Sequence, residues 1–197
     1  MKHFSMLRSF HTADLFTIGN GCCGIVAVFH AMRFLATGDV RSIHLTALLV
    51  LLAIVFDVLD GRIARWRHRA SPLGRELDSL ADLISFGVAP AAIAYAVGLN
   101  TPVDQIVLVY FVLCGLSRLA RYNVTADALA GTDGKVPYYE GTPIPTSIFP
   151  LALVLIAYHR EQLGSVVVLG VPFHLTVLLF ALSGSLMISK TLHVPKP

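Results

Sequence analysis

Charged side chains are scarce in this chain of 197 residues. Asp, Glu, Lys and Arg together make up 14% of it, whereas soluble domains average about 25%. Hydrophobic residues make up 55%, so too few polar side chains remain to cover the surface of a soluble domain. This composition excludes a disordered chain and argues against an ordinary soluble enzyme. It predicts an integral membrane protein in contact with the lipid bilayer.

Cysteine and net charge are also low. Cys22, Cys23 and Cys114 all lie in apolar stretches, and an odd number in that setting indicates reduced packing residues, not a disulfide framework or a zinc site. A net charge of +3 is too small to indicate a nucleic-acid partner, and none is expected. No repeat, low-complexity tract or long linker divides the chain, so residues 1–197 are expected to form one membrane domain.

Long apolar stretches are abundant. A helix needs about 20 mostly apolar residues to cross a bilayer. We therefore expect an all-α integral membrane bundle of six transmembrane helices. Their approximate ranges are Leu15–Leu35, Ile43–Ile63, Leu77–Val97, Gln105–Tyr122, Pro145–Tyr158 and Ser165–Ile188. Gly170 and Pro172 predict a kink in the last stretch or a short surface helix before it.

The ends and the basic residues predict the orientation in the membrane. The N-terminus does not read as a cleaved signal, and Phe4–Phe16 is expected to form an amphipathic surface helix. Basic residues gather at both ends and in the links after the second and fourth stretches. These residues are Lys2, Arg8, Arg62, Arg65, Arg67, Arg69, Arg75, Arg118, Arg121, Lys135, Lys190 and Lys196. The positive-inside rule then places both termini and these links in the cytoplasm.

Four acidic residues stand where two apolar stretches approach the same surface. Asp57 and Asp60 end the second stretch, and Asp78 and Asp82 begin the third. Spacings of three and four residues put each pair on one helix face, and the short link predicts an antiparallel hairpin. The four carboxylates should therefore converge near the cytoplasmic surface, where charge is costly unless it is neutralised.

Two explanations of this convergence remain open from the residues alone. Two hard divalent cations with oxygen ligands would suit four carboxylates, and such a site favours displacement at phosphorus. Alternatively, the carboxylates are helix-end charges paired with the many nearby arginines. A cation path through a transporter is compatible with intramembrane carboxylates as well, but these gather at one side and do not line a full crossing. A purely structural membrane protein would gain nothing from them.

The spacing of the surrounding residues resembles a known signature. The segment from Asp57 to Asp82 matches every fixed position of D-x2-D-G-x2-A-R-x8-G-x3-D-x3-D, the signature of the CDP-alcohol phosphotransferase family. The resemblance implies transfer of a substituted phosphate from a CDP-linked lipid to an alcohol, with release of CMP. Together with the predicted orientation of the aspartates, this places the active site at the cytoplasmic side, and the resemblance also implies a homodimer.

The same resemblance implies roles for individual residues. It makes Asp57, Asp60, Asp78 and Asp82 the ligands of two divalent ions, Mg2+ or Mn2+, and it makes Asp82 the general base, with pure metal ligation as the alternative. The residues implied for CDP-lipid binding are Thr17, Asn20, Asp60, Gly61, Arg65, Ser71, Gly74 and Asp78. Tight helix packing for the glycines, and a hydrogen bond within the bundle for Asn20, remain as alternatives.

A second region bears on the acceptor alcohol. Within residues 114–146, Leu-Ser-Arg-Leu-Ala-Arg-Tyr-Asn-Val and the later Tyr-Glu-Gly-Thr-Pro-Ile-Pro are similar to elements of the phosphatidylserine synthase subfamily, although Thr142 stands where that subfamily commonly has Leu. The resemblance implies serine as the acceptor. Arg118 and Arg121 could bind its carboxylate, and Asn123, Tyr139 and Glu140 could orient its amine.

Alternatives for the acceptor region also stay open. The two arginines could instead cap a helix end and contact lipid phosphate. Glycerol 3-phosphate, inositol phosphate or choline could replace serine with the same chemistry.

Overall fold

The computed structural model describes residues 12–67, 72–129, 138–168, 170–189, 191 and 193–195. The surface helix expected at Phe4–Phe16 therefore lies largely outside the described residues. In chain order the helical elements are α1 (Thr12–Thr37), α2 (Val40–Arg67), α3 (Pro72–Asp82), the π-helical η2 (Leu83–Val88), α4 (Ala89–Ala96), α5 (Pro102–Leu129), the 3-10 turn η3 (Ile144–Ser147), α6 (Ile148–His159), the 3-10 turn η4 (Leu175–Val177) and α7 (Leu178–Ile188). The strands are β1 (Tyr138–Glu140), β2 (Ser165–Val168), β3 (Val171–His174) and β4 (His193–Pro195).

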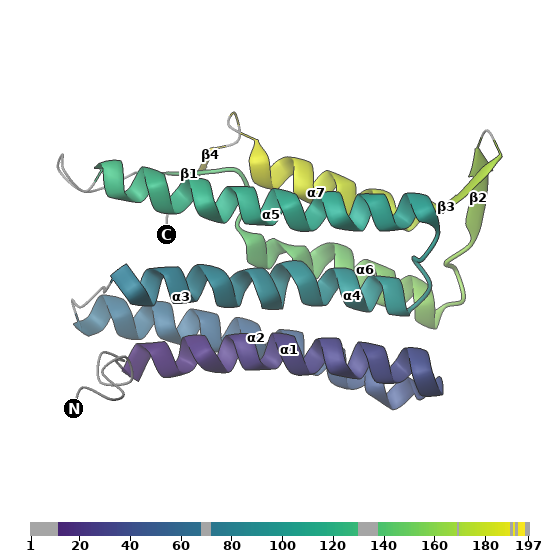
Figure 1. The fold of residues 1–197 in the computed structure, drawn as a ribbon, viewed down its shortest axis with the longest axis horizontal. Helices are drawn as coiled ribbons and strands as arrows, with labels where there is room; N and C mark the ends of the chain where they lie inside the picture. The colour runs from purple at the N-terminus through teal and green to yellow at the C-terminus, as the bar shows by residue number, and fades with distance from the viewer. Residues whose placement is uncertain are drawn as a thin grey trace, which may run out of the picture.

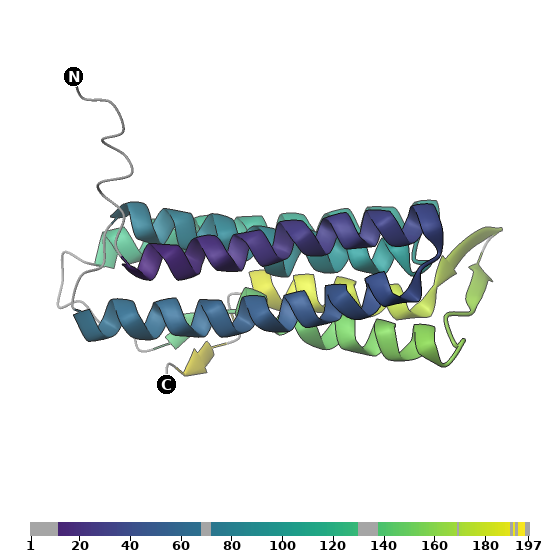
Figure 2. The ribbon, with the colours of Figure 1, turned by 90° about the horizontal axis from the view of Figure 1, so that it is seen from below.

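The helices run side by side along the long axis of the molecule, with each long helix antiparallel to the next (Figure 1). α1 packs along α2, and the run from α3 through η2 to α4 packs against α1. α5 then packs against α7, which closes the other side of the bundle. In the second view the β1–β4 ribbon lies at the same end as the N-terminal side of α1, and the β2–β3 hairpin extends from the opposite end (Figure 2).

Four described helical runs are long and apolar enough to cross a membrane. They are Asp14–Thr37, Val40–Ile63, Leu73–Ala96 and Pro102–Val124. Their outer faces carry large apolar side chains, such as Leu15 at 63% and Ile106 at 70% exposure, which suits contact with lipid and not with water. Two shorter apolar helices, Ile144–His159 and Leu175–Ile188, lie in the same bundle.

The third span changes its helix type in the middle. α3 ends at Asp82, the π-helical η2 follows directly, and α4 completes the run. In a π-helix the backbone bonds reach from residue i to i+5, so the residues after Asp82 face different neighbours than an unbroken α-helix would give them. Segments of this kind often occur at functional sites.

The sixth predicted span, Ser165–Ile188, is helical only in its second half, and its first half forms neither the predicted kinked helix nor a surface helix. Residues 165–168 pair with 171–174 as an antiparallel hairpin, and the α-helix begins only at Leu178. Gly170 takes a positive φ of 80° in the turn, and the β-branched valines beside it favour extended backbone. The fold is therefore mostly helical, as the all-α prediction expected, and the described residues add two small two-stranded sheets.

Small residues let the helices approach closely. Ala27 and Ala31 on α1 and Ala53 on α2 are fully buried, as expected of helix contacts in membranes. Larger side chains, including Phe86 and Phe111, fill the core between η2 and α5. The three cysteines are free, as the sequence predicted.

Candidate active site

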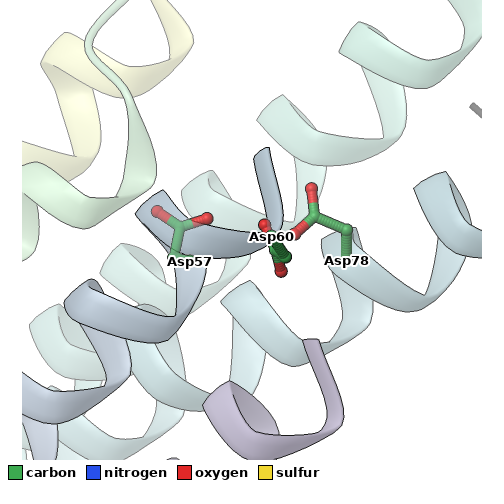
Figure 3. A group of neighbouring side chains, drawn as sticks. All are labelled: Asp57, Asp60 and Asp78. Carbon is green, nitrogen blue, oxygen red and sulfur yellow. The ribbon is translucent and has the colours of Figure 1, made fainter. Parts of the chain in front are cut away.

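Three carboxylates converge between α2 and α3. Asp57 and Asp60 lie one turn apart on α2, and Asp78 reaches toward them from α3 (Figure 3). One carboxylate oxygen of each lies within 4.8 Å of one from each of the others. The convergence predicted from the helical spacing is therefore present for these three residues.

Asp82 lies beside that group of three but outside the set whose carboxylate oxygens are all within 4.8 Å of one another. Its side chain is buried, at 8% exposure, and lies close enough to the other carboxylates to be repelled by them. Asn20 Nδ2 donates a hydrogen bond of 2.9 Å to Asp82 Oδ1. The four aspartates thus divide into a triad and a single carboxylate with an amide partner of its own.

Helix α1 contributes a hydrogen-bond donor to the triad and another to Asp82. Thr17 Oγ1 donates a hydrogen bond of 2.9 Å to Asp60 Oδ2, and Asn20 lies one turn further along the same face. Both side chains are buried. Two residues that the sequence assigned to the CDP-lipid therefore touch the aspartates directly, which links α1 to α2 and α3.

The triad has the chemistry of a hard-cation site. Carboxylate oxygens are the ligands that Mg2+ and Mn2+ prefer, and three of them from two helices can share one ion or bridge two. Asp78 Oδ1 is buried and accepts no hydrogen bond within the described residues, so an oxygen that needs a positive partner is already in place. The residues present therefore fit a divalent metal.

Of the remaining residues assigned to the CDP-lipid, the structure describes some fully and others only in part. Gly61 follows Asp60 directly on α2, and Gly74 lies in the first turn of α3, so both flank the triad along the chain. The backbone of Arg65 belongs to the last turns of α2. Its side chain, and Ser71 as a whole, lie outside the described residues.

Asn123, near the end of the long α5, is joined to α3. Its Nδ2 donates to Glu76 Oε2 and to Ser79 Oγ, at 3.1 Å each, and Ser79 Oγ lies 3.3 Å from its Oδ1. Sequence reasoning did not find Glu76 and Ser79. The signal was available, because they lie three residues apart on α3, on either side of Asp78.

The rest of the acceptor region meets the end of α7. Arg121 donates to the carbonyl of Ile188 at 3.3 Å, and the Thr142 N–H donates to the carbonyl of Leu186 at 3.2 Å. Gly141 takes a positive φ of 74°, and a Cβ there would collide with the Met187 carbonyl oxygen.

Arg118 is buried one turn before Arg121 on α5. Tyr139 and Glu140 lie in β1, paired with Val194 and His193 of β4, and their side chains are outside the described part of the chain. The region is therefore tied to the C-terminal end of the chain, which sequence reasoning had not connected with it.

Comparisons with known proteins place the chain in a family. Residues 10–186 match the CDP-alcohol phosphatidyltransferase family. The chain is 46% identical to the CDP-diacylglycerol–serine O-phosphatidyltransferase of Saccharomyces cerevisiae over 207 aligned residues, which cover 99% of this chain and 74% of that protein. It is 33% identical to the protein of the same name from Bacillus subtilis, with 74% of this chain and 75% of that protein covered. For the Helicobacter pylori protein of that name the identity is 34%, and the alignment covers 80% of this chain and 67% of that protein. The family match covers most of the chain, and the aspartates of the family's signature lie together in the structure. The chain therefore belongs to the CDP-alcohol phosphatidyltransferase family.

Proposed function

We propose that this protein transfers the phosphatidyl group of CDP-diacylglycerol to the hydroxyl of L-serine, giving phosphatidylserine and CMP. The observation that carries the proposal is its similarity, over nearly the whole chain, to a transferase named for this reaction. The triad of Asp57, Asp60 and Asp78 beside a separately held Asp82 supports it, because displacement at phosphorus needs bound cations and a base.

The proposed roles follow the positions of the side chains. Asp57, Asp60 and Asp78, with Asp82 at the edge of the group, would hold two divalent ions, Mg2+ or Mn2+. When bound, these ions would grip the diphosphate oxygens and stabilise the departing CMP. Gly61 and Gly74, beside the triad, leave room for the nucleotide. Arg65 and Ser71, with Thr17, complete the proposed CDP-lipid site, whereas Asn20 contacts Asp82.

Asp82 is the proposed general base. It accepts the proton of the serine hydroxyl, and the serine oxygen forms a bond to the phosphorus atom that carries diacylglycerol. The bond from that phosphorus to the bridging oxygen of the diphosphate breaks, and CMP leaves with the electron pair. Burial of Asp82 supports this role, because a dry site keeps water from competing with serine.

For the acceptor we propose the region from Arg118 to Glu140. The buried guanidinium of Arg118 is suited to the serine carboxylate. Arg121, Asn123, Tyr139 and Glu140 are proposed to complete the pocket, and the bonds of Asn123 to α3 bring this end of α5 beside the helix that carries Asp82.

The acceptor assay tests the function directly. Purified protein is incubated with CDP-diacylglycerol and Mn2+, and CMP release is measured with serine, glycerol 3-phosphate, inositol phosphate or choline. We expect release and labelled lipid with serine alone. Release with another alcohol and not with serine would assign the same chemistry to a different acceptor, and no release with any of them from a folded sample would contradict the transferase.

The membrane arrangement forms part of the proposal. We propose that the two shorter apolar helices also lie in the membrane, which gives six spans in one domain of residues 1–197. At about 1.5 Å per residue, Ile144–His159 covers about 24 Å of the roughly 30 Å hydrocarbon core. The termini and the aspartates would face the cytoplasm, and a homodimer is proposed as the working unit, which mass measurement in detergent would check.

A further inference from the structure

The buried amide of Asn20 contacts the carboxylate that the proposed mechanism uses as its base. Asn20 has no exposed surface, and its Nδ2 lies 2.9 Å from Asp82 Oδ1. An ionised carboxylate only accepts hydrogen bonds, so the NH2 group of the amide must face it. This hydrogen bond restrains the orientation of the carboxylate through one of its two oxygens.

The backbone of Asn20 is fixed by a second contact. Ser85 Oγ donates a hydrogen bond of 2.8 Å to the Asn20 carbonyl oxygen. Ser85 lies in η2, three residues beyond Asp82, so the two contacts come from consecutive parts of one helical run. Asn20 is therefore held through its side chain and its main chain by the same neighbour.

The close approach of the two helices depends on glycine. A Cβ on Gly24 would lie 2.5 Å from Ser85 Oγ and 2.8 Å from Ser85 Cα, distances that no side chain tolerates without a shift. Gly21 faces Ala81, and its Cβ position lies 3.5 Å from the Ala81 Cβ, an ordinary contact, so it is Gly24 that requires glycine. Helix α1 is thus in backbone contact with the segment on both sides of Asp82.

The π-helix η2 sets which of its residues face α1. η2 begins at Leu83, directly after Asp82, and Ser85 within it is fully buried against α1. Because π-helical bonding changes the phase of the residues that follow, it allows Ser85 to meet Asn20 while Asp82 still faces the site.

From these contacts we infer that Asn20 is a positioning residue, which acts on the reaction through Asp82 and not through the cytidine base. The inference rests on the proposed transferase function. Asn20 takes Oδ1 of Asp82, which leaves Oδ2 as the oxygen that receives the proton of the acceptor hydroxyl. Ser85 supports the same geometry from the main-chain side.

The test separates chemistry from nucleotide binding. The turnover number kcat and the KM for CDP-diacylglycerol and serine are measured in detergent micelles, and CDP binding in the presence of Mn2+ is measured by calorimetry. For Asn20→Ala we expect kcat to fall about 10- to 100-fold, with the KM for CDP-diacylglycerol and the Kd for CDP changed less than about threefold.

Two further variants make the result specific. Ser85→Ala removes only the hydroxyl, so we expect the same pattern with a drop in kcat of about threefold, and this variant decides the matter should Asn20→Ala fail to fold. Thr46→Ala is the matched control: Thr46 is equally buried, but it bonds to Ile43 at the far end of α2. Its kcat should stay within about twofold of wild type.

The outcomes that overturn the inference differ from those that overturn the function. A raised KM for CDP-diacylglycerol and weaker CDP binding with kcat retained would make Asn20 a nucleotide contact. Unchanged kcat in both variants would equally refute a positioning role. Wild-type protein that binds CDP but releases no CMP with serine would contradict the proposed function alone, and the comparison of kcat and KM is then made with the alcohol that does support release.

Discussion

At the scale of residues, the four aspartates of the signature fall into two environments. Asp57, Asp60 and Asp78 share one small space, whereas Asp82 has an amide partner of its own. Membership of one signature therefore does not give the four aspartates the same surroundings. The triad carries mutual repulsion that a cation would relieve, and the single carboxylate is suited to moving a proton.

Asp57→Asn should raise the melting temperature in the absence of metal and lower it in the presence of metal. Removing one charge from the triad relieves repulsion, so in EDTA we expect the melting temperature to rise by about 2–4 °C, equivalent to about 1 kcal/mol. In saturating Mn2+ the variant should melt at a lower temperature than wild type. The variant has lost a metal ligand, so the bound metal stabilises its folded state less. Thermal unfolding in detergent under both conditions measures this, and a variant as strongly stabilised by Mn2+ as wild type would argue against Asp57 as a ligand.

Asp82→Asn should abolish turnover while nucleotide binding survives. Loss of a general base costs about 100- to 10,000-fold in kcat, and an amide of the same shape leaves the triad in place. CMP release is compared with calorimetric CDP binding in Mn2+. Turnover within tenfold of wild type would exclude Asp82 as the base.

At the scale of elements, contacts between helices far apart in the sequence build the site. Asn20 of α1 forms a hydrogen bond with Asp82, at the end of α3. Asn123 of α5 forms hydrogen bonds with Glu76 and Ser79 of α3, so α1 and α5 both contact α3. Gly24 of α1 permits the close packing of α1 on the segment after Asp82. Arg121 and Thr142 of the acceptor region form hydrogen bonds with backbone carbonyls at the end of α7.

Gly24→Ala should loosen α1 from η2. The new methyl group meets Ser85 at overlapping distance, so we expect a loss of about 1–3 kcal/mol in stability together with reduced kcat. Gly19→Ala is the control on the same helix, because its Cβ would lie 3.4 Å from the Phe56 ring, an ordinary contact. Thermal unfolding and turnover of both variants are compared, and equal behaviour would show that close packing at position 24 is unimportant.

Asp104→Asn should release the β2–β3 hairpin from α5. The buried Asp104 accepts from the Thr101 and His174 N–H groups at 3.0 Å each, and His174 Nδ1 lies 2.7 Å away. An asparagine presents an NH2 group where an acceptor is needed, so we expect a cost of about 2–4 kcal/mol. The melting temperature should fall while kcat, measured below the transition, stays near wild type, because the hairpin lies at the end opposite the aspartates (Figure 1). A large loss of kcat at full folding would reveal coupling between the two ends.

At the scale of the whole molecule, the aspartates, the start of α1 and the β1–β4 ribbon lie toward the same end of the bundle (Figures 1 and 2). The aspartates lie in the C-terminal half of α2 and the N-terminal half of the third span, and β4 pairs with β1 at that same end. The loop between α6 and the hairpin lies at the other end. A membrane would therefore separate the site from this loop.

Cysteine labelling checks this orientation. In a background without the three native cysteines, a cysteine at Gly164, where a Cβ meets no atom within 4 Å, should react with a membrane-impermeant maleimide in intact cells. A cysteine at Lys196 should react only after permeabilisation. The reverse pattern would place the aspartates on the outer side.

The sequence by itself determined the membrane class, the four long helices and the position of the acidic site. Helical periodicity is local, so the spacing within each pair of aspartates, with the short link between the two stretches, sufficed to predict that the carboxylates converge. The signature and the elements of the acceptor region likewise indicated the family before any contact was known. Each of these depends on residues close together in the chain.

Tertiary structure alone decided which partner each polar side chain takes. The turn at Gly170 became a hairpin, in contact with Asp104 some 70 residues earlier, where apolarity had predicted helix. Asn20 is paired with Asp82 across 62 residues, and the π-helix that permits the Ser85 contact has no signal in local propensity. Hydrogen bonds in a dry interior are set by which helices pack together, and that packing is a property of the whole chain.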